Sequence, residues 1–107
     1  MKKIIIIGGV AAGMSAAAKA RRLDKEAKIT VYEKTEFVSW GACGMPYYVG
    51  GFFDDSNVMI ARTAEANIKS GIDLKIKNEV IKLDSKNKKV LVRDFETNKE
   101  FEDEYDK

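Results

Sequence analysis

The first third of the chain constrains the fold most, because a strand-like run, a glycine turn and a helix-forming segment follow directly on one another. Residues 3–7 (KIIII) form a β-branched run that ends at Gly8, which is typical of a fully buried, parallel strand. From Ala11 to about Asp24 the residues favour a helix. Lys28–Glu33 (KITVYE) is the second predicted strand. This order predicts an α/β fold built on a parallel sheet.

The predicted helix has two distinct faces. Small or apolar residues recur on one side, which would let the helix sit close to the sheet: Gly13, Ala16, Ala20 and Leu23. Polar residues spaced i, i+4 and i+7 lie on another side: Ser15, Lys19 and Arg22. This polar stripe suits an anionic ligand, although an ordinary solvated helix face has the same pattern.

The second half of the chain predicts mostly β structure. A helix is expected over Thr63–Ser70, followed by a strand over Ile72–Ile76. Glu79–Leu83 and Val90–Asp94 flank a polar turn at residues 85–88 and predict an antiparallel hairpin. The tail, EFEDEYDK, is charged and ends without a terminating signal.

Composition narrows the classes of function. A chain of 107 residues, 45% hydrophobic and 34% charged, is long enough for one small domain with a core. The net charge of +2 and the lack of a basic, aromatic-rich patch argue against nucleic-acid binding. One cysteine and no histidine exclude an internal disulfide and an ordinary zinc site, so we expect a reducing, cytoplasmic setting and no metal.

The amino-terminal residues also have features of a secretory signal: a basic start, an apolar run and Ala18-Lys19-Ala20. However, Gly8-Gly9 breaks the apolar run after four isoleucines, and the alanine-rich segment continues into charged residues without a helix break. No other stretch approaches the roughly 18 apolar residues of a membrane span. We therefore expect this segment to fold with the rest of the domain, away from membranes.

The turn GGVAAG, with an acidic residue ending the second strand, is typical of a dinucleotide-binding βαβ unit. Gly8 permits a tight exit from the strand, and Gly13 lets the helix approach it closely. Unpaired N–H groups and the positive dipole end of the helix would attract a pyrophosphate. Glu33, 20 residues after Gly13, would accept hydrogen bonds from ribose hydroxyls and repel a 2′-phosphate.

Val10 departs from this pattern, because it occupies the second glycine position. A valine is tolerated there only if its φ is negative and its side chain points away, with Gly9 relieving the crowding. A turn of small residues without a ligand is the alternative interpretation. The motif alone does not separate FAD from NAD.

The single cysteine, Cys43, lies in residues 38–51 (VSWGACGMPYYVGG), which hold four of the eight glycines. Small neighbours leave its sulfur unshielded: Gly41, Ala42 and Gly44. Ser39 lies four residues earlier, where its hydroxyl could reach the thiolate, and a helix starting near Cys43 would lower the thiol pKa. These features predict a redox-active thiol; the alternative is a buried cysteine that packs as a small hydrophobe.

Together these segments resemble the FAD-dependent pyridine nucleotide–disulfide oxidoreductases. The similarity is closest to the single-cysteine branch of CoA-disulfide reductases, NADH oxidases and NADH peroxidases. It rests on IIIIGGVAAGMSAAAKARRLD, ITVYEK and FVSWGACGMPYYVGG, extends through the whole chain, and is most specific at Ser39, Cys43 and Pro46-Tyr47. Val10 is also usual in that branch. The resemblance implies a Rossmann-like FAD-binding βαβ unit, with a parallel sheet and an antiparallel hairpin.

The resemblance also implies site residues. FAD contacts would come from Gly8, Gly9, Val10, Ala11, Ala12, Gly13, Glu33, Lys34, Cys43 and Val80. Cys43, with Ser39 beside it, would cycle between a thiolate and a mixed disulfide with coenzyme A, or a sulfenic acid when peroxide or oxygen is the oxidant. CoA contacts would come from Ser15, Lys19, Arg22 and Ser39.

Two residues depart from the CoA-disulfide reductases. Ala42 stands where they have an asparagine before the cysteine, and Gly71 stands where they have a lysine that contacts CoA. These departures leave CoA-disulfide, peroxide, polysulfide and oxygen all open as the oxidant.

Members of this family are several-fold longer than 107 residues. The resemblance therefore implies that residues 1–107 are the N-terminal part of a FAD-binding domain, with the NAD(P)H-binding and dimerisation domains absent. In a full-length homodimer, electrons would pass from NAD(P)H through FAD to Cys43, whereas this chain alone would bind FAD weakly or not at all. The alternative is a non-catalytic nucleotide-binding module with a redox-sensing cysteine.

Overall fold

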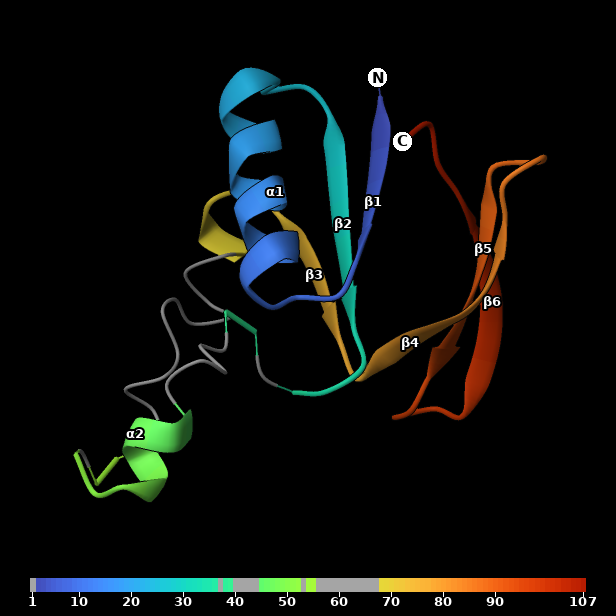
Figure 1. The fold of residues 1–107 in the computed structure, drawn as a ribbon. Helices are drawn as coiled ribbons and strands as arrows, with labels where there is room; N and C mark the ends of the chain where they lie inside the picture. The colour runs from blue at the N-terminus through green and yellow to red at the C-terminus, as the bar shows by residue number, and fades with distance from the viewer. Residues whose placement is uncertain (1, 37, 40–44, 53, 56–67) are drawn as a thin grey trace.

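The computed structural model describes residues 2–36, 38–39, 45–52, 54–55 and 68–107. Within them, helices and strands follow in the order β1 (Lys3–Ile7), α1 (Ala11–Leu23), β2 (Lys28–Glu33), α2 (Met45–Val49), β3 (Asp73–Ile76), β4 (Asn78–Asp84), β5 (Lys89–Asp94) and β6 (Lys99–Glu104). The parallel sheet lies between α1 on one face and the antiparallel sheet of β4, β5 and β6 on the other (Figure 1). No helix in these ranges is both long and apolar enough to cross a membrane.

The parallel sheet has the strand order β1-β2-β3, so β2 pairs with a strand on each side. The predicted α/β fold and the bounds of the first two strands are confirmed. The expectation that residues 3–7 are fully buried is wrong, since Ile7 is 56% exposed. The chain end covers only part of the outer edge of β1: Ile5 N–H donates to the Lys107 carbonyl at 3.0 Å, and Asp106 N–H donates to the Lys3 carbonyl at 2.8 Å.

Alternate side chains of β2 face opposite layers, as the two-residue period of a strand requires. Ile29 and Val31 belong to the core against α1, whose buried members are Met14, Ala17, Ala27, Ile29, Val31, Val38, Ile72 and Leu74. Tyr32 belongs to a second, smaller core against the antiparallel sheet, with Val90 and Val92. One central strand therefore holds both layers together.

Helix α1 has the predicted length, but its predicted inner face is only half right: Gly13 lies against Gly8 and Ile6, and Ala20 packs against the core. Met14 and Ala17 are the buried residues, whereas Ala16 is exposed and Leu23 is 75% exposed. Alanines occur on every side of this helix, so the apolar pattern does not select one face. Packing against the sheet decides which face is buried, and Met14 belongs to the core that forms there.

The antiparallel sheet confirms the predicted hairpin, with β4 and β5 paired from Asn78↔Asp94 to Asp84↔Lys89. The sequence did not predict β6, which pairs with β5 in residues 99–104. Its composition is mostly charged, and its stability comes from pairing rather than from an apolar face. Of the helix expected over Thr63–Ser70, only residues 68–70 are described; residues 68–69 are helical, and Ser70 lies in a turn.

Candidate nucleotide-binding site

A cavity of about 440 Å³ lies where the carboxyl ends of β1 and β2 meet the start of β4. Its lining residues are Ile7, Gly8, Val10, Tyr32, Glu33, Lys34, Asn78, Glu79 and Val80. Five of the predicted cofactor contacts are among them: Gly8, Val10, Glu33, Lys34 and Val80. In open α/β sheets, ligands bind beyond the carboxyl ends of the strands, which is the place of this cavity.

The glycine turn has the backbone that the sequence predicts. Gly8 has a φ of +97°, which residues with a side chain rarely adopt. Its N–H donates to the Tyr32 carbonyl at 2.9 Å, which ties the turn to β2. A Cβ at Gly13 would overlap the Gly8 carbonyl oxygen, so α1 approaches the turn as closely as its backbone allows.

The start of α1 suits an anion. Val10 is the N-cap residue with a φ of −96°, so the backbone condition for a valine in this position is met. Among the described residues no side-chain hydrogen bond caps this end, and the first turn of α1 contains no acidic residue. The first N–H groups of a helix have no partner within it, so the backbone of Ala11, Ala12 and Gly13 could bind a phosphate here.

Glu33 is buried, and its carboxylate is held by three donors. Gly9 N–H donates to Oε1 at 2.9 Å, while the N–H and hydroxyl of Thr35 donate to Oε2 at 2.7 and 2.6 Å. A carboxylate accepts about four hydrogen bonds, so Oε1 can take one more donor, such as a ribose hydroxyl. Thr35 was not predicted as a partner of Glu33, although a hydroxyl residue shortly after a strand-end acid is a recognisable local partner.

The hydrogen bonds to Glu33 also set its charge. Burial by itself would raise the pKa of this carboxyl group. Hydrogen bonds from Thr35 and Gly9, together with the charge of Lys34, instead hold the pKa below its ordinary value of 4.5. Glu33 is therefore an ionised acceptor at neutral pH.

The other four lining residues were not predicted, and two of them, Asn78 and Tyr32, are buried residues with side-chain hydrogen bonds. Asn78 is only 8% exposed, and its Nδ2 donates to the Ile76 carbonyl at 2.8 Å, which fixes its carboxamide beside the cavity. Tyr32 is 4% exposed, and its hydroxyl donates to Asp103 Oδ2 at 2.6 Å. The partner of Asn78 is local, two residues earlier, whereas the partner of Tyr32 is 71 positions away and is marked by no local motif.

The predicted thiol lies outside the described residues, but its predicted partner Ser39 does not. Ser39 is buried, has a φ of 54°, and donates its N–H to the Gly9 carbonyl at 2.7 Å. The short helix α2 begins at Met45, close after Cys43 in the sequence. The predicted contact between Ser39 and Cys43 therefore stays a prediction.

The polar stripe predicted on α1 lies on its outer face, since Ser15, Lys19 and Arg22 are all exposed. Gly71, the position of the missing lysine, has a φ of +92° and accepts a 2.7 Å hydrogen bond from Arg21 Nη2. A lysine would be strained in that backbone conformation, which gives a physical reason for glycine at this position.

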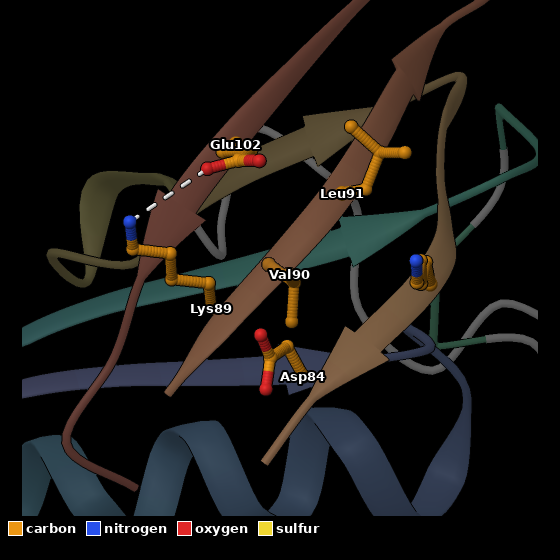
Figure 2. A pocket seen from close by; sticks show the side chains of 6 residues that line it. Asp84, Lys89, Val90, Leu91 and Glu102 are labelled. Carbon is orange, nitrogen blue, oxygen red and sulfur yellow. Dashed lines mark ion pairs between the residues drawn. The ribbon is translucent and has the colours of Figure 1, made fainter. Parts of the chain in front are cut away.

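A smaller cavity of about 150 Å³ lies on the antiparallel sheet and contains none of the predicted site residues (Figure 2). Lys89, at its rim, pairs with Glu102 at 3.9 Å. No group of three potential metal-ligating side chains occurs in the ranges that the structure describes.

Comparison with known proteins identifies relatives over almost the whole chain. The coenzyme A disulfide reductase of Staphylococcus epidermidis is 40% identical over 107 residues, which are 99% of this chain and 24% of that protein. The water-forming NADH oxidase from Lactobacillus brevis superposes with a TM-score of 0.95 and 27% identity, covering 100% of this chain and 24% of the oxidase. The NAD-dependent persulfide reductase from A. fulgidus has a TM-score of 0.90 and 36% identity, covering 97% of this chain and 19% of the reductase.

The chain thus spans about a quarter of the length of the curated relative that it matches. Residues 2–107 match the model of the family described as pyridine nucleotide-disulphide oxidoreductase. With its strand, glycine turn, helix and second strand arranged around one cavity, this chain belongs to the pyridine nucleotide-disulphide oxidoreductase family.

Proposed function

We propose that this chain is the FAD-binding N-terminal part of a flavoprotein oxidoreductase that passes electrons from NAD(P)H through FAD to Cys43. The cavity carries this proposal, because it brings the glycine turn, Glu33 and Val80 together from separate segments of the chain. Membership of the family supports both cofactors. When bound, FAD supplies the two-electron relay between a nicotinamide and a disulfide.

The residues around the cavity fit FAD in chemistry as well as in position. The uncapped start of α1 would hold the pyrophosphate, and Glu33 Oε1 would accept one ribose hydroxyl. Lys34 and the backbone of Val80 would contact the adenosine end. The ionised Glu33 would disfavour a 2′-phosphate through charge repulsion.

Cys43 is the proposed redox residue, with Ser39 as its hydrogen-bond partner. Its thiolate would attack one sulfur of a substrate disulfide, forming a mixed disulfide and releasing the other half as a thiolate. Two electrons from NAD(P)H would then restore the cysteine and release the second thiol. With peroxide, the thiolate would attack one oxygen and break the O–O bond, which forms a sulfenic acid and releases hydroxide that leaves as water. Two electrons from NAD(P)H would then reduce the sulfenic acid to the thiolate and a second water.

A small disulfide is the oxidant we favour. The coenzyme A disulfide reductase relative and the exposed stripe of Ser15, Lys19 and Arg22 support a CoA-linked substrate. The named activities of the structural neighbours make a persulfide or oxygen the alternatives. The nicotinamide site and a homodimer interface would lie in the part of the full-length protein that this chain does not span.

The cofactor proposal is tested by replacing Glu33 with Gln in the full-length protein and measuring adenosine diphosphate binding to its flavin-free form by calorimetry. Loss of a hydrogen bond to a charged group costs about 1.5–3 kcal/mol, so the affinity should fall at least about tenfold. Glu36→Gln is the matched control, because Glu36 is exposed and pairs with Lys77 at 4.0 Å, away from the cavity lining. Equal affinities of the two variants would refute the proposed role of Glu33.

The thiol proposal is tested with Cys43→Ser in the full-length protein. Disulfide or peroxide reduction should be abolished while flavin absorbance is retained. Unchanged turnover would show that Cys43 does not transfer electrons, and a thiol whose titration leaves the flavin spectrum unperturbed would favour a remote, redox-sensing cysteine. The chain alone is expected to bind FAD weakly or not at all; a yellow preparation that oxidises NADH would contradict this.

A further inference from the structure

Gly9 is hydrogen-bonded on both sides of its Cα atom to segments that are distant in sequence. Its N–H donates to Glu33 Oε1 at 2.9 Å in a buried position. Its carbonyl accepts the N–H of Ser39 at 2.7 Å. One residue thus joins the proposed ribose acceptor to the residue proposed to stand beside the thiol. Neither Gly9 nor Ser39 lines the cavity itself.

The space around Gly9 admits no side chain. A Cβ at this position would lie 2.9 Å from Val38 Cγ1 and 3.2 Å from Glu33 Cβ, both closer than ordinary contacts. Val38 is 2% exposed and belongs to the core against α1. The backbone of Gly9 is therefore packed directly against the residue before Ser39, and a displacement at Gly9 must be shared by residues 38–39.

The conformation of Ser39 depends on this packing. A φ of 54° is uncommon for a residue with a side chain and persists where surrounding contacts hold it. The short hydrogen bond to the Gly9 carbonyl is one such contact. The position of Ser39 is thus set partly by the glycine turn, rather than by its own local sequence.

We propose that Gly9 is a positioning residue that couples the nucleotide cavity to Ser39. A ribose hydroxyl on Glu33 Oε1 would share that oxygen with the Gly9 N–H and change the hydrogen bond between them. Because the Gly9 carbonyl holds Ser39, nucleotide binding would adjust residues 38–39. This inference rests on the proposed function, since it requires the cavity to bind a nucleotide.

The coupling is tested by two-dimensional amide NMR of the flavin-free full-length protein during titration with adenosine diphosphate. The amide signals of Gly8, Gly9 and Glu33 should shift, and the Ser39 amide should shift with the same apparent Kd. If the cavity amides shift and Ser39 does not, the coupling is refuted and the nucleotide site stands. If no cavity amide shifts, the nucleotide site is refuted together with its coupling.

A measurement without nucleotide tests the link separately. Glu33→Gln weakens the acceptor for the Gly9 N–H and should move the Ser39 amide signal, whereas Ala16→Ser, on the exposed face of α1, should not. An unchanged Ser39 signal in Glu33→Gln would overturn the coupling whatever the nucleotide does.

A double-mutant cycle distinguishes positioning from general destabilisation. Gly9→Ala should displace Ser39 and lower the affinity for adenosine diphosphate about tenfold or more, because its Cβ meets Val38 Cγ1. Val38→Ala removes that atom, so Gly9→Ala/Val38→Ala should recover part of the affinity and of the Ser39 signal position. A double variant that binds more weakly than Gly9→Ala would overturn the proposal.

Discussion

The two faces of the parallel sheet are stabilised in different ways. The face toward α1 packs against an apolar core of eight buried residues. The face toward the antiparallel sheet has three buried core residues and a polar cluster: the Tyr32 hydroxyl donates to Asp103 at 2.6 Å, and Lys3 Nζ lies 3.1 Å from the same carboxylate. The stability of the face toward α1 should be insensitive to pH. The stability of the face toward the antiparallel sheet depends on charge, and this face adjoins the proposed nucleotide cavity through Tyr32.

The largest losses of unfolding free energy should come from truncating a buried side chain in each of the two cores. Ile29→Ala should lower the free energy of unfolding by about 2–5 kcal/mol, because Ile29 is 1% exposed in the larger core. Val92→Ala should cost roughly 2 kcal/mol, since fewer carbon atoms are removed from the smaller core. Urea unfolding measures both, and a larger loss for Val92→Ala would reverse the comparison.

The polar cluster should contribute less than the larger core. Asp103→Ala leaves the buried Tyr32 hydroxyl without its acceptor, which costs about 1–3 kcal/mol. Glu104→Ala, one residue later and exposed, is the matched control and should change the free energy of unfolding little. Equal urea midpoints for the two variants would show that the cluster does not stabilise the contact between the sheets.

The pH dependence should arise mainly on this second face. Burial alone would raise the pKa of Asp103, but hydrogen bonds from Tyr32 and Lys3 hold it below its ordinary value of 3.8. A lowered pKa gives stability that is present above the ordinary value and is lost as the pH falls below it. Glu33, whose pKa is also lowered, should add to this acid loss of stability as the pH falls below its ordinary pKa of 4.5.

Tyr32 acts at the other end of the pH range. Burial, and then the hydrogen bond to Asp103, raise its pKa above the ordinary 10.0, so this stability is present below pH 10 and is lost as the pH rises above it. Urea unfolding across pH should therefore show an alkaline decline that Tyr32→Phe removes and an acid decline that Asp103→Asn reduces. Profiles unchanged by both substitutions would contradict a charge-dependent second face.

The smallest effect is expected at the rim of the cavity on the antiparallel sheet. Lys89 pairs with Glu102 and Glu104, each at 3.9 Å, and all three side chains are largely exposed. Exposed ion pairs contribute little, so Lys89→Ala should change the free energy of unfolding by about 0.5 kcal/mol or less. A loss above about 1 kcal/mol would show that these ion pairs stabilise the antiparallel sheet more than exposed pairs ordinarily do.

Local sequence was sufficient for the features that depend on neighbouring residues. The bounds of β1 and β2 follow from β-branched runs, and the glycine turn follows from backbone conformations that only glycine adopts readily. The hairpin of β4 and β5 follows from apolar segments around a polar turn. Val80, 47 positions after Glu33, was instead predicted from the family resemblance, and both residues line the cavity.

Tertiary structure decided the features whose partners lie far away in the chain. Packing against the sheet decided which residues of α1 are buried: Met14 and Ala17 are buried, whereas Ala16 and Leu23 of the predicted inner face are exposed. Pairing with β5 made a strand of the charged residues 99–104. Tyr32 and Asp103, 71 positions apart, meet only when the two sheets stack. Likewise, the bonds from Gly9 to Glu33 and Ser39 form only once the strand end, the glycine turn and residues 38–39 pack together, since no local pattern encodes contacts over that separation.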